Sequence, residues 1–307
     1  MSLGREISLN ISIPPRAQWL VGKQEEGSLR PYIFMRKENL IPNPGSRHHI
    51  EWFDPRPIMY FEALDLTNHS FGEAVIFLEN LTFGPDLAMP RWVFWDCALV
   101  PGFVSGFAIH RDQLPDSIRT AFGQFNGLNK TEWVPISLFI IIPTIHEGEW
   151  VAHNLCTINS VLPEAERLYG LGFLTKAFGL WYANVETCIG MTQWRKPALK
   201  LHSHFGYLEV LTAYSPLHTY DDTMTYRCEI STRIWRLFFS REEDLYFSQN
   251  FCRSDLVIDP FDRDSMRRAQ IAIEQKKYRF YLSPREIALR DERSVYTLFF
   301  KKVGECL

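Results

Sequence analysis

Six residues between a strand-like and a helix-like segment have the types and spacing of an anion-binding turn. The segment Arg167-Leu168-Tyr169-Gly170-Leu171-Gly172 has the form R-x-x-G-x-G. Glycines let backbone N–H groups crowd around an anion, and the start of a helix adds a partial positive charge. A phosphate or pyrophosphate is the natural ligand of such a turn. The six residues therefore predict that the chain binds a phosphorylated cofactor.

Two better-known phosphate-binding patterns do not fit these residues. The turn lacks the first glycine of G-x-G-x-x-G, and no acidic residue ends a following strand about twenty residues later, as dinucleotide-binding folds require. No Gly-Lys-Ser/Thr follows, which excludes a Walker loop. A tight turn that binds no ligand is the alternative that the six residues leave open.

The segments around the turn predict the elements that position it. A strand leads to the turn over about 151–161, and residues 173–184 place apolar side chains at helical spacing. Further along the chain we expect a strand, a helix and two closing strands, over 185–191, 197–204, 207–214 and 224–230. This alternation predicts a mixed α/β fold, in which helices cover a central sheet.

The rest of the chain divides into three parts. Residues 1–54, rich in Pro, Arg and Gly, predict an irregular N-terminal arm. Residues 55–231 predict the main domain, in which β-branched and aromatic runs indicate strands over 58–66, 73–78, 91–100, 103–109 and 134–142, with a short helix over 115–122. Residues 232–307 predict an α/β extension packed on the same domain. Within it we expect a helix over 264–281, a second helix that begins with a capping box at Ser283, and a strand over 295–300.

Composition restricts the class of protein. The chain has 307 residues, of which 46% are hydrophobic and 22% charged, and its net charge is −3. These values are ordinary for a globular protein and favour neither nucleic acid nor a membrane as a partner. The six cysteines lie far apart, and the clusters His146-Glu147 and His48-His49 lack the spacing of metal ligands. We expect a cytoplasmic protein with free thiols and no metal.

A second pattern downstream identifies the family that the chain resembles. Val161-Leu162-Pro163 precedes the turn, with one residue more than usual before Arg167, and the segment from Arg195 to His202 is followed by Gly206-Tyr207. Together these patterns resemble the GNAT superfamily of N-acetyltransferases, with its V-x-P, Q/R-x-x-G-x-G/A and N-x-x-A-x-x-L-Y motifs. The resemblance implies an α+β fold whose central sheet is mixed and mainly antiparallel, with a splayed strand pair and flanking helices.

The resemblance implies acetyl-coenzyme A as the cofactor, with its pyrophosphate on the turn. The residues that it assigns to cofactor binding are Val161, Arg167, Leu168, Tyr169, Gly170, Leu171, Gly172, Phe173 and Arg195. The implied reaction transfers an acyl group to a primary amine of a small molecule or peptide, which attacks the thioester directly. A homodimer is one of the states that the long terminal extensions allow.

The catalytic residues depart from the family pattern. His202 replaces the tyrosine that often protonates the leaving thiolate, and Arg195 replaces an asparagine, where its guanidinium could reach a phosphate. Glu149 and His153, near the start of the strand before the turn, and Asp96 are the candidate bases. The alternative to an enzyme is a catalytically silent, coenzyme A-binding or regulatory module, and a further alternative is an interaction protein without a cofactor.

Overall fold

The computed structural model describes residues 29–48, 55–65, 69–99, 102–216, 220–240, 242–275, 277–289 and 295–302. Within these residues the chain forms two compact units. Unit 1 comprises the described residues up to Glu147 together with Ala152–Asn184. Unit 2 comprises Gly148–Val151 and the described residues from Val185 onward. The strand that precedes the glycine-rich turn therefore begins in unit 2 and continues in unit 1.

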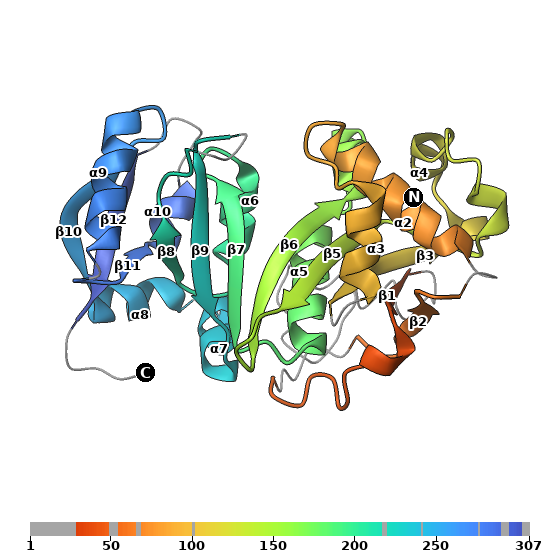
Figure 1. Cartoon of the computed structure of the whole chain (residues 1–307), viewed down its shortest axis with the longest axis horizontal. Helices are drawn as coiled ribbons and strands as arrows, with labels where there is room; N and C mark the ends of the chain where they lie inside the picture. Colours follow the sequence, from red (N-terminus) through yellow and green to blue (C-terminus); the bar gives the residue numbers. More distant parts are fainter. Residues whose placement is uncertain are drawn as a thin grey trace. The chain divides into compact units, whose positions relative to one another are not determined.

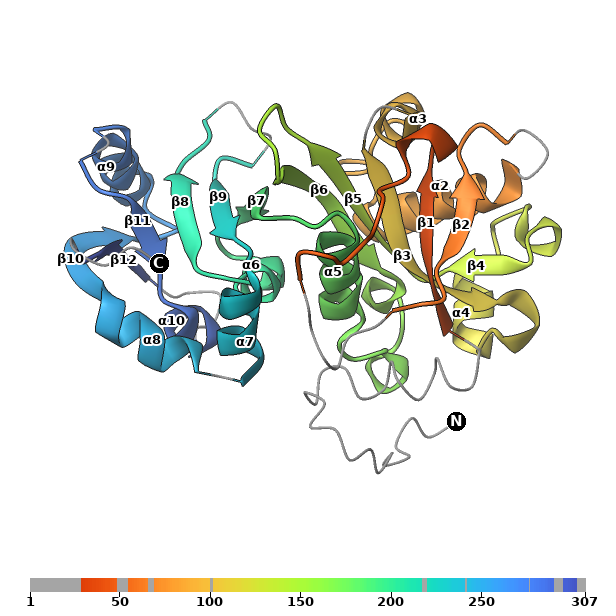
Figure 2. The same cartoon turned by 90° about the horizontal axis from the view of Figure 1, so that it is seen from below.

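Unit 1 is a sheet with helices on both faces. Its elements are β1 (Leu29–Met35), β2 (Met59–Glu62), α2 (His69–Phe83), α3 (Arg91–Leu99), β3 (Phe103–His110), α4 (Asp116–Ala121), β4 (Trp133–Pro135), β5 (Ser137–Pro143), β6 (Glu149–Thr157) and α5 (Leu171–Tyr182). The strands follow the order β6-β5-β3-β1-β2, and β4 pairs with β3. Strand β1 is parallel to β2 and antiparallel to β3, which is itself antiparallel to β5. Helices α2 and α3 cover one face and α5 the other (Figures 1 and 2).

The two-sided cover explains the apolar composition of the central strand. Residues Phe103–Ile109 of β3 are all buried, as expected of a strand with helices on both faces. Helix α5 approaches the sheet closely at Gly179, where an added Cβ would lie 2.5 Å from the ring of Phe139. A glycine at this position therefore sets the distance between the helix and the sheet that support the turn.

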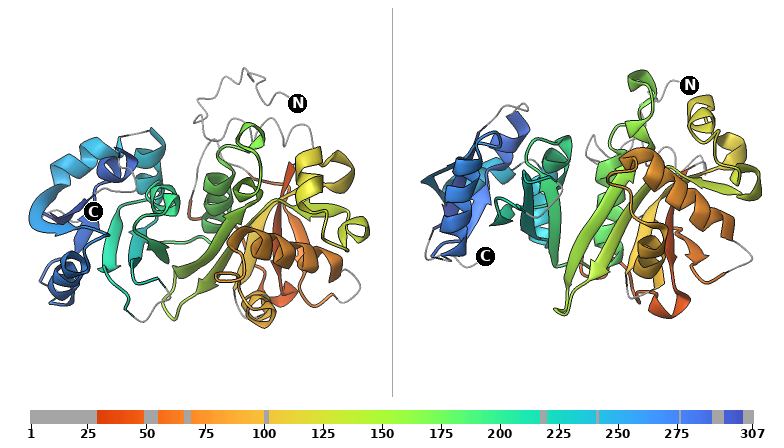
Figure 3. Two further views of the ribbon diagram at one scale, coloured as in Figure 1. Left: turned by 90° about the horizontal axis from the view of Figure 1, so that it is seen from above. Right: turned by 45° about the horizontal axis from the view of Figure 1, so that its top comes forward.

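Unit 2 is an antiparallel sheet. Its elements are β7 (Thr187–Gln193), α6 (Pro197–His202), β8 (Leu208–Thr212), β9 (Thr223–Glu229), α7 (Thr232–Ser240), α8 (Glu243–Asn250), β10 (Phe251–Ile258), α9 (Arg263–Glu274), β11 (Phe280–Leu282), α10 (Pro284–Leu289) and β12 (Tyr296–Lys301). The strands follow the order β10-β12-β11-β8-β9-β7. The pairing of β11 with β8 joins the C-terminal strands, blue in Figure 3, to β8, β9 and β7. The predicted C-terminal extension is thus a continuation of the sheet of unit 2.

The predicted fold class is confirmed. The structure is α+β with a mainly antiparallel sheet, and the order of strand, glycine-rich turn, helix, strand, helix and strand is realised by β6, α5, β7, α6 and β8. At the start of β6, the carbonyl of Gly148 accepts hydrogen bonds from the N–H groups of Glu186 and Thr187, at 2.8 and 3.0 Å. The splay of β6 from β7 beyond these bonds stays a prediction of the resemblance.

Two strand predictions were wrong. Residues 73–78 and 91–100 were expected to be strands, but they belong to α2 and α3, and residue 100 lies outside the described residues. The buried residues Phe71, Ala74, Val75 and Leu78 of α2 follow the i, i+3, i+4, i+7 spacing of a helix. Aromatic and β-branched content favoured strands, whereas the period of the apolar positions indicated helices.

The predicted N-terminal arm and the predicted C-terminal helix differ in part from the structure. Residues 29–35 of the expected irregular arm form β1, a strand inside the sheet, while residues 1–28 and 49–54 lie outside the described residues. The helix expected over 264–281 ends at Glu274, and β11 follows. The Ser283 half of the predicted capping box is present, because the Ser283 hydroxyl oxygen accepts from the Glu286 N–H at 3.4 Å. The Glu286 carboxylate accepts from the Thr297 N–H at 3.1 Å, and the reciprocal bond of the box stays a prediction. The predicted domain boundaries at 54/55 and 231/232 differ from the limits of the two units and stay predictions.

Candidate functional site

The glycine-rich turn leads directly into α5. After β6 the chain makes two short 3-10 helices, Ile158–Ser160 and Glu164–Glu166, and Arg167 follows in extended backbone. Gly170 has φ +85° and is the N-cap of α5. This left-handed conformation is one that glycine adopts without strain, so its presence at this position fits the predicted turn. The second 3-10 helix fills the stretch between Pro163 and Arg167, which is one residue longer than the family pattern.

A side chain that sequence reasoning missed holds the turn in place. The Leu168 N–H donates to Asn159 Oδ1 at 2.7 Å, and Asn159 Nδ2 donates to the Leu168 carbonyl at 2.8 Å. The same carbonyl accepts from the Leu171 N–H at 3.1 Å. Because both polar atoms of Asn159 bind one residue of the turn, the backbone is fixed before α5 begins. An asparagine between a strand and a glycine-rich turn was the available signal.

The start of α5 presents backbone N–H groups. The Leu174 N–H donates to the Gly170 carbonyl at 2.9 Å and closes the first turn. Gly172 is the second residue of the helix, where an N–H has no acceptor within the helix, and the helix dipole makes this end positive. The side chains of Leu171 and Phe173 are buried in the core, so these two residues can offer a ligand only their backbone. Together the first residues of α5 can hold an anion.

The remaining predicted cofactor residues of the turn face solvent. The side chain of Tyr169 is 68% exposed, and that of Val161 is 37% exposed. Arg167 is also exposed, and its Nε donates to the Leu162 carbonyl at 3.4 Å. The guanidinium therefore lies beside the turn with most of its donors available to a phosphate.

The candidate bases lie on different elements. Glu149 is on the part of β6 that belongs to unit 2, where its Oε2 is 3.6 Å from Nη2 of Arg227. His153 is exposed on the part of β6 in unit 1, with Nδ1 3.0 Å from Oδ1 of the neighbouring Asn154. Asp96 is exposed on α3 and not on a strand as expected. The strand thus presents one carboxylate and one imidazole, and the helix carries the third candidate.

His202 and Arg195 both have partners within unit 2. His202 ends α6 and is buried, with its ring centroid 5.2 Å from that of Tyr226, a phenol whose pKa burial raises well above its usual value. Arg195 Nε donates to the buried Asp222 carboxylate at 2.9 Å, and its guanidinium lies over the Phe261 ring at 5.1 Å. Sequence reasoning did not foresee either environment. A role of Arg195 at a phosphate stays a prediction.

The described part of the chain carries neither a metal cluster nor a membrane-spanning helix. Its His, Cys, Asp and Glu side chains form no group of three or more that could hold a metal ion. None of its helices combines the length and apolar composition needed to cross a bilayer.

Comparison with known proteins gives similarity of structure alone. No protein-family model and no curated protein matches the sequence. A protein assigned to the GNAT family of acetyltransferases from Desulfovibrio desulfuricans is 14% identical, with a TM-score of 0.35, over 55% of this chain and 96% of that one. A chain of the NatC complex bound to Gag peptide and CoA is 10% identical, with a TM-score of 0.34, over 55% and 94%. Nourseothricin acetyltransferase is 8% identical, with a TM-score of 0.28, over 43% and 65%.

Structural similarities with TM-scores between 0.28 and 0.35 carry no functional argument. The order of elements around the turn and the left-handed glycine that begins α5 are properties of this chain. On these properties the chain resembles the GNAT acetyltransferases in its fold.

Proposed function

We propose that the chain is an acyl-coenzyme A-dependent N-acetyltransferase whose glycine-rich turn binds the pyrophosphate of the cofactor. The observation that carries this proposal is the turn itself: Gly170 in the left-handed conformation directs the backbone into α5, and Asn159 fixes the residue two positions earlier. A preorganised set of N–H groups at a helix start suits a phosphate. Arg167 adds a guanidinium, the side chain best suited to hold phosphate oxygens in pairs.

The hydrogen-bond donors at the turn can bind an anion without a metal ion. The Gly172 N–H and the Arg167 guanidinium are donors, and the buried side chains of Leu171 and Phe173 fix the helix against the sheet. When bound, acetyl-coenzyme A supplies a thioester whose acyl carbon an amine can attack. Because the amine attacks directly, the chain needs no nucleophilic serine or cysteine.

The chain's own groups must move two protons. We propose Glu149 or His153 as the base that takes the proton from the acceptor ammonium, directly or through water. His202 is proposed as the acid that protonates the leaving thiolate. The acceptor is proposed to be a primary amine of a small molecule or peptide.

The state of the thiols bears on the proposed compartment. The cysteines in the described part of the chain are free: Cys97, Cys156, Cys188, Cys228 and Cys252. Free, mostly buried thiols support the proposal of a cytoplasmic protein.

The second candidate is a coenzyme A-binding module without catalysis. Two observations favour it: Arg195 is engaged by Asp222, and His202 is enclosed beside Tyr226. Both groups would have to leave or share these partners to serve a cofactor and a leaving group. The same turn would then bind the cofactor, and no acyl group would be transferred.

Binding and turnover separate the candidates. We expect coenzyme A at a hundredfold excess over its Kd to stabilise the protein by about 2.7 kcal/mol in thermal unfolding. With acetyl-coenzyme A and a panel of amines, release of free thiol is expected, and His202→Gln should lower kcat more than it changes cofactor affinity. Stabilisation without thiol release on any acceptor would favour the silent module, and a melting temperature unmoved by the cofactor would contradict both candidates.

A further inference from the structure

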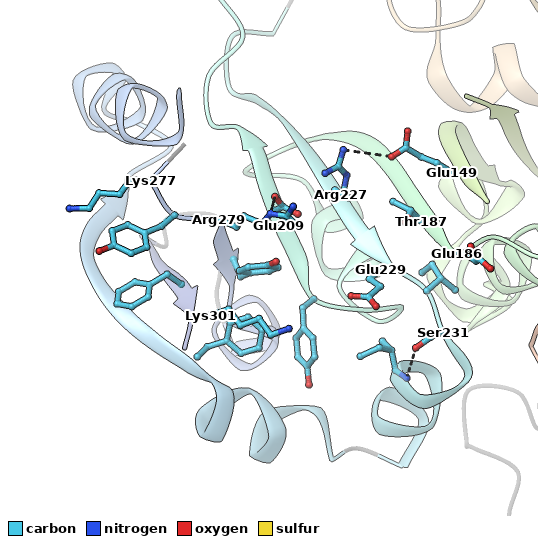
Figure 4. A pocket seen from close by; sticks show the side chains of 17 residues that line it. Glu149, Glu186, Thr187, Glu209, Arg227, Glu229, Ser231, Lys277, Arg279 and Lys301 are labelled. Atoms are coloured by element: carbon cyan, nitrogen blue, oxygen red, sulfur yellow. Dashed lines mark hydrogen bonds and ion pairs between the residues drawn. The ribbon is translucent and has the colours of Figure 1, made fainter. Parts of the chain in front are cut away.

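Unit 2 contains a cavity that has one lining residue, Glu149, in common with the proposed function. Its volume is about 860 Å³, and all its lining residues belong to unit 2. Strands β8, β9 and β11 form its floor, and residues of β10, β12 and α7 contribute to its walls. Its size is in the range of sites for small organic ligands. Figure 4 shows the lining side chains projecting from these strands.

Cross-strand neighbours place a charged row across the floor. In the sheet register, Glu209 of β8 lies opposite Arg227 of β9 on one side and opposite Tyr281 of β11 on the other. Directly opposite residues of paired strands project from the same face. The floor therefore carries a carboxylate with a guanidinium on one side and a phenol on the other.

The charges on this floor are loosely paired. Glu209 is only 9% exposed, and its Oε1 is 3.8 Å from Nε of Arg279, beyond hydrogen-bond distance. Arg227 and Glu149 point toward one another with 3.6 Å between their nearest atoms (Figure 4). Within the described residues, the Nε of Arg227 is buried without a hydrogen-bond partner. A buried charge or donor without a short bond costs free energy, and a ligand that supplies the bond recovers it.

An aromatic wall adjoins the charged row. The ring centroids of Tyr207 and Phe251 lie 5.3 Å apart, and those of Phe251 and Tyr281 lie 5.0 Å apart. All three residues line the cavity. Their faces and edges offer apolar contact to a ligand group near Glu209 and the arginines.

We propose that this cavity binds a small zwitterion, a free amino acid or short peptide with an apolar side chain. Its carboxylate would bind the guanidinium groups of Arg227 and Arg279, and its ammonium would bind Glu209. Its side chain would pack against the aromatic wall. Oppositely charged groups within a few ångströms favour a ligand that carries both signs of charge.

The balance of charges excludes simpler ions. Four glutamates, Glu209 among them, line the cavity, and so do four cationic residues, Arg227 and Arg279 among them. A simple anion would meet the carboxylates, and a simple cation would meet the guanidinium and ammonium groups. Like charges placed next to one another oppose binding. Of the three charge types, the zwitterion alone satisfies both sets.

The test titrates ligands into the full chain without coenzyme A, so its outcome is independent of the proposed function. The probes are L-phenylalanine, the dipeptides Gly-Phe and Phe-Gly, and two analogues that each lack one charge, phenylacetate and phenethylamine. We expect the amino acid or a dipeptide to bind, and each analogue to bind at least about tenfold more weakly, as loss of a charged hydrogen bond predicts. Whether the amino acid or a dipeptide binds best identifies the source of the zwitterion.

Variants locate the binding. Glu209→Gln should weaken binding of the zwitterion at least about tenfold and should not weaken binding of phenylacetate, which the Glu209 carboxylate repels. Arg285→Gln, exposed on α10 and outside the cavity, should change neither. No binding of any zwitterion at millimolar concentration would overturn the proposal. So would equal binding of L-phenylalanine and both analogues, a result that does not depend on whether any variant folds.

Discussion

Each unit buries a glutamate, and the two carboxylates are held differently. In unit 1, Glu79 of α2 is 1% exposed, and its Oε1 accepts from the Met89 N–H at 2.9 Å and from Asn154 Nδ2 at 2.8 Å. In unit 2, Glu209 is 9% exposed, and its ion pair with Arg279 spans 3.8 Å. Burial raises the pKa of both groups above the ordinary value.

The bonding of these two carboxylates distinguishes a polar group that stabilises the fold from one that can bind a ligand. The bonds to Glu79 come from the segment after α2 and from β6, so this carboxylate ties parts of unit 1 together. Glu209 lines a cavity, and within the described residues the attraction of Arg279 and Arg227 acts on its carboxylate over longer distances. A buried group with short bonds supports the fold, whereas a buried group with long pairs and open space beside it can serve a ligand.

The largest effect is expected at Glu79. Glu79→Ala leaves the Met89 N–H and the Asn154 amide without their acceptor, and we expect a loss of about 3 kcal/mol in the free energy of unfolding. Glu79→Gln is the matched control, because both donors bind Oε1, which the amide retains. Urea unfolding at pH 7 measures both variants. Equal losses for the two substitutions would mean that the charge, and not the acceptor, stabilises unit 1.

Asn159 should behave as Glu79 does, on a smaller scale. Asn159→Ala removes both bonds to Leu168, and we expect a loss of about 1–2 kcal/mol because the residue is only partly buried. Coenzyme A affinity should fall with it, since the turn before α5 is no longer fixed. Unfolding in urea and a binding titration test the two effects. Unchanged stability would show that the turn is held by α5 alone.

Glu209 should show the opposite behaviour in unfolding. Glu209→Gln removes a buried charge that makes no short hydrogen bond to the part of the chain that the structure describes. The free energy of unfolding should therefore change by less than about 1 kcal/mol. The same urea experiment measures this change. A loss as large as that of Glu79→Ala would contradict the distinction between the two glutamates, because it would show that Glu209 also stabilises the fold.

The smallest effect is on the dependence of stability on pH. A carboxyl whose pKa is raised in the folded state keeps its proton after the unfolded chain has lost it, so stability falls as pH rises above the ordinary value of 4.5 toward the raised pKa. Each Glu→Gln variant should remove its share of this fall. Arg279 and Arg227 oppose the rise at Glu209, whereas hydrogen bonds oppose it at Glu79.

Salt separates the two titrations. Raising the ionic strength from about 0.1 M to about 1 M screens the attraction of the arginines, so the pKa of Glu209 should rise further while that of Glu79 stays the same. Unfolding curves of the wild type and the two Gln variants, measured across pH at both salt concentrations, give these shifts. Equal responses to salt would contradict the assigned causes.

Local patterns in the sequence predicted a large part of the fold. The glycine-rich turn before α5, the helix that starts at Pro197 and the hydroxyl cap at Ser283 are set by nearby residues, and each is found where expected. Helices α2 and α3 were mistaken for strands because their aromatic content outweighed their period.

The environment of the candidate site depends on contacts between distant segments. The pairing of Tyr281 with Glu209 joins the C-terminal strands to β8, and the bond between Arg195 and Asp222 ties down a predicted phosphate ligand. No pattern of neighbouring residues predicts either pairing, since a strand edge or a charged side chain is compatible with many partners in the same chain. The loop predicted to bind the cofactor could therefore be found from the sequence, whereas the cavity of unit 2 could not.

The central claim is that the turn from Arg167 to Gly172 holds the pyrophosphate of coenzyme A, and a calorimetric titration of coenzyme A tests it most directly. Gly172→Glu places a negative charge where the phosphate would bind, while a glutamate in the first turn suits the helix, so the fold should be kept. Ala165→Glu adds the same charge at an exposed position just before the turn. We predict that Gly172→Glu weakens binding at least about a hundredfold and that Ala165→Glu changes it less than about threefold. Equal affinities in the wild type and Gly172→Glu would contradict the account.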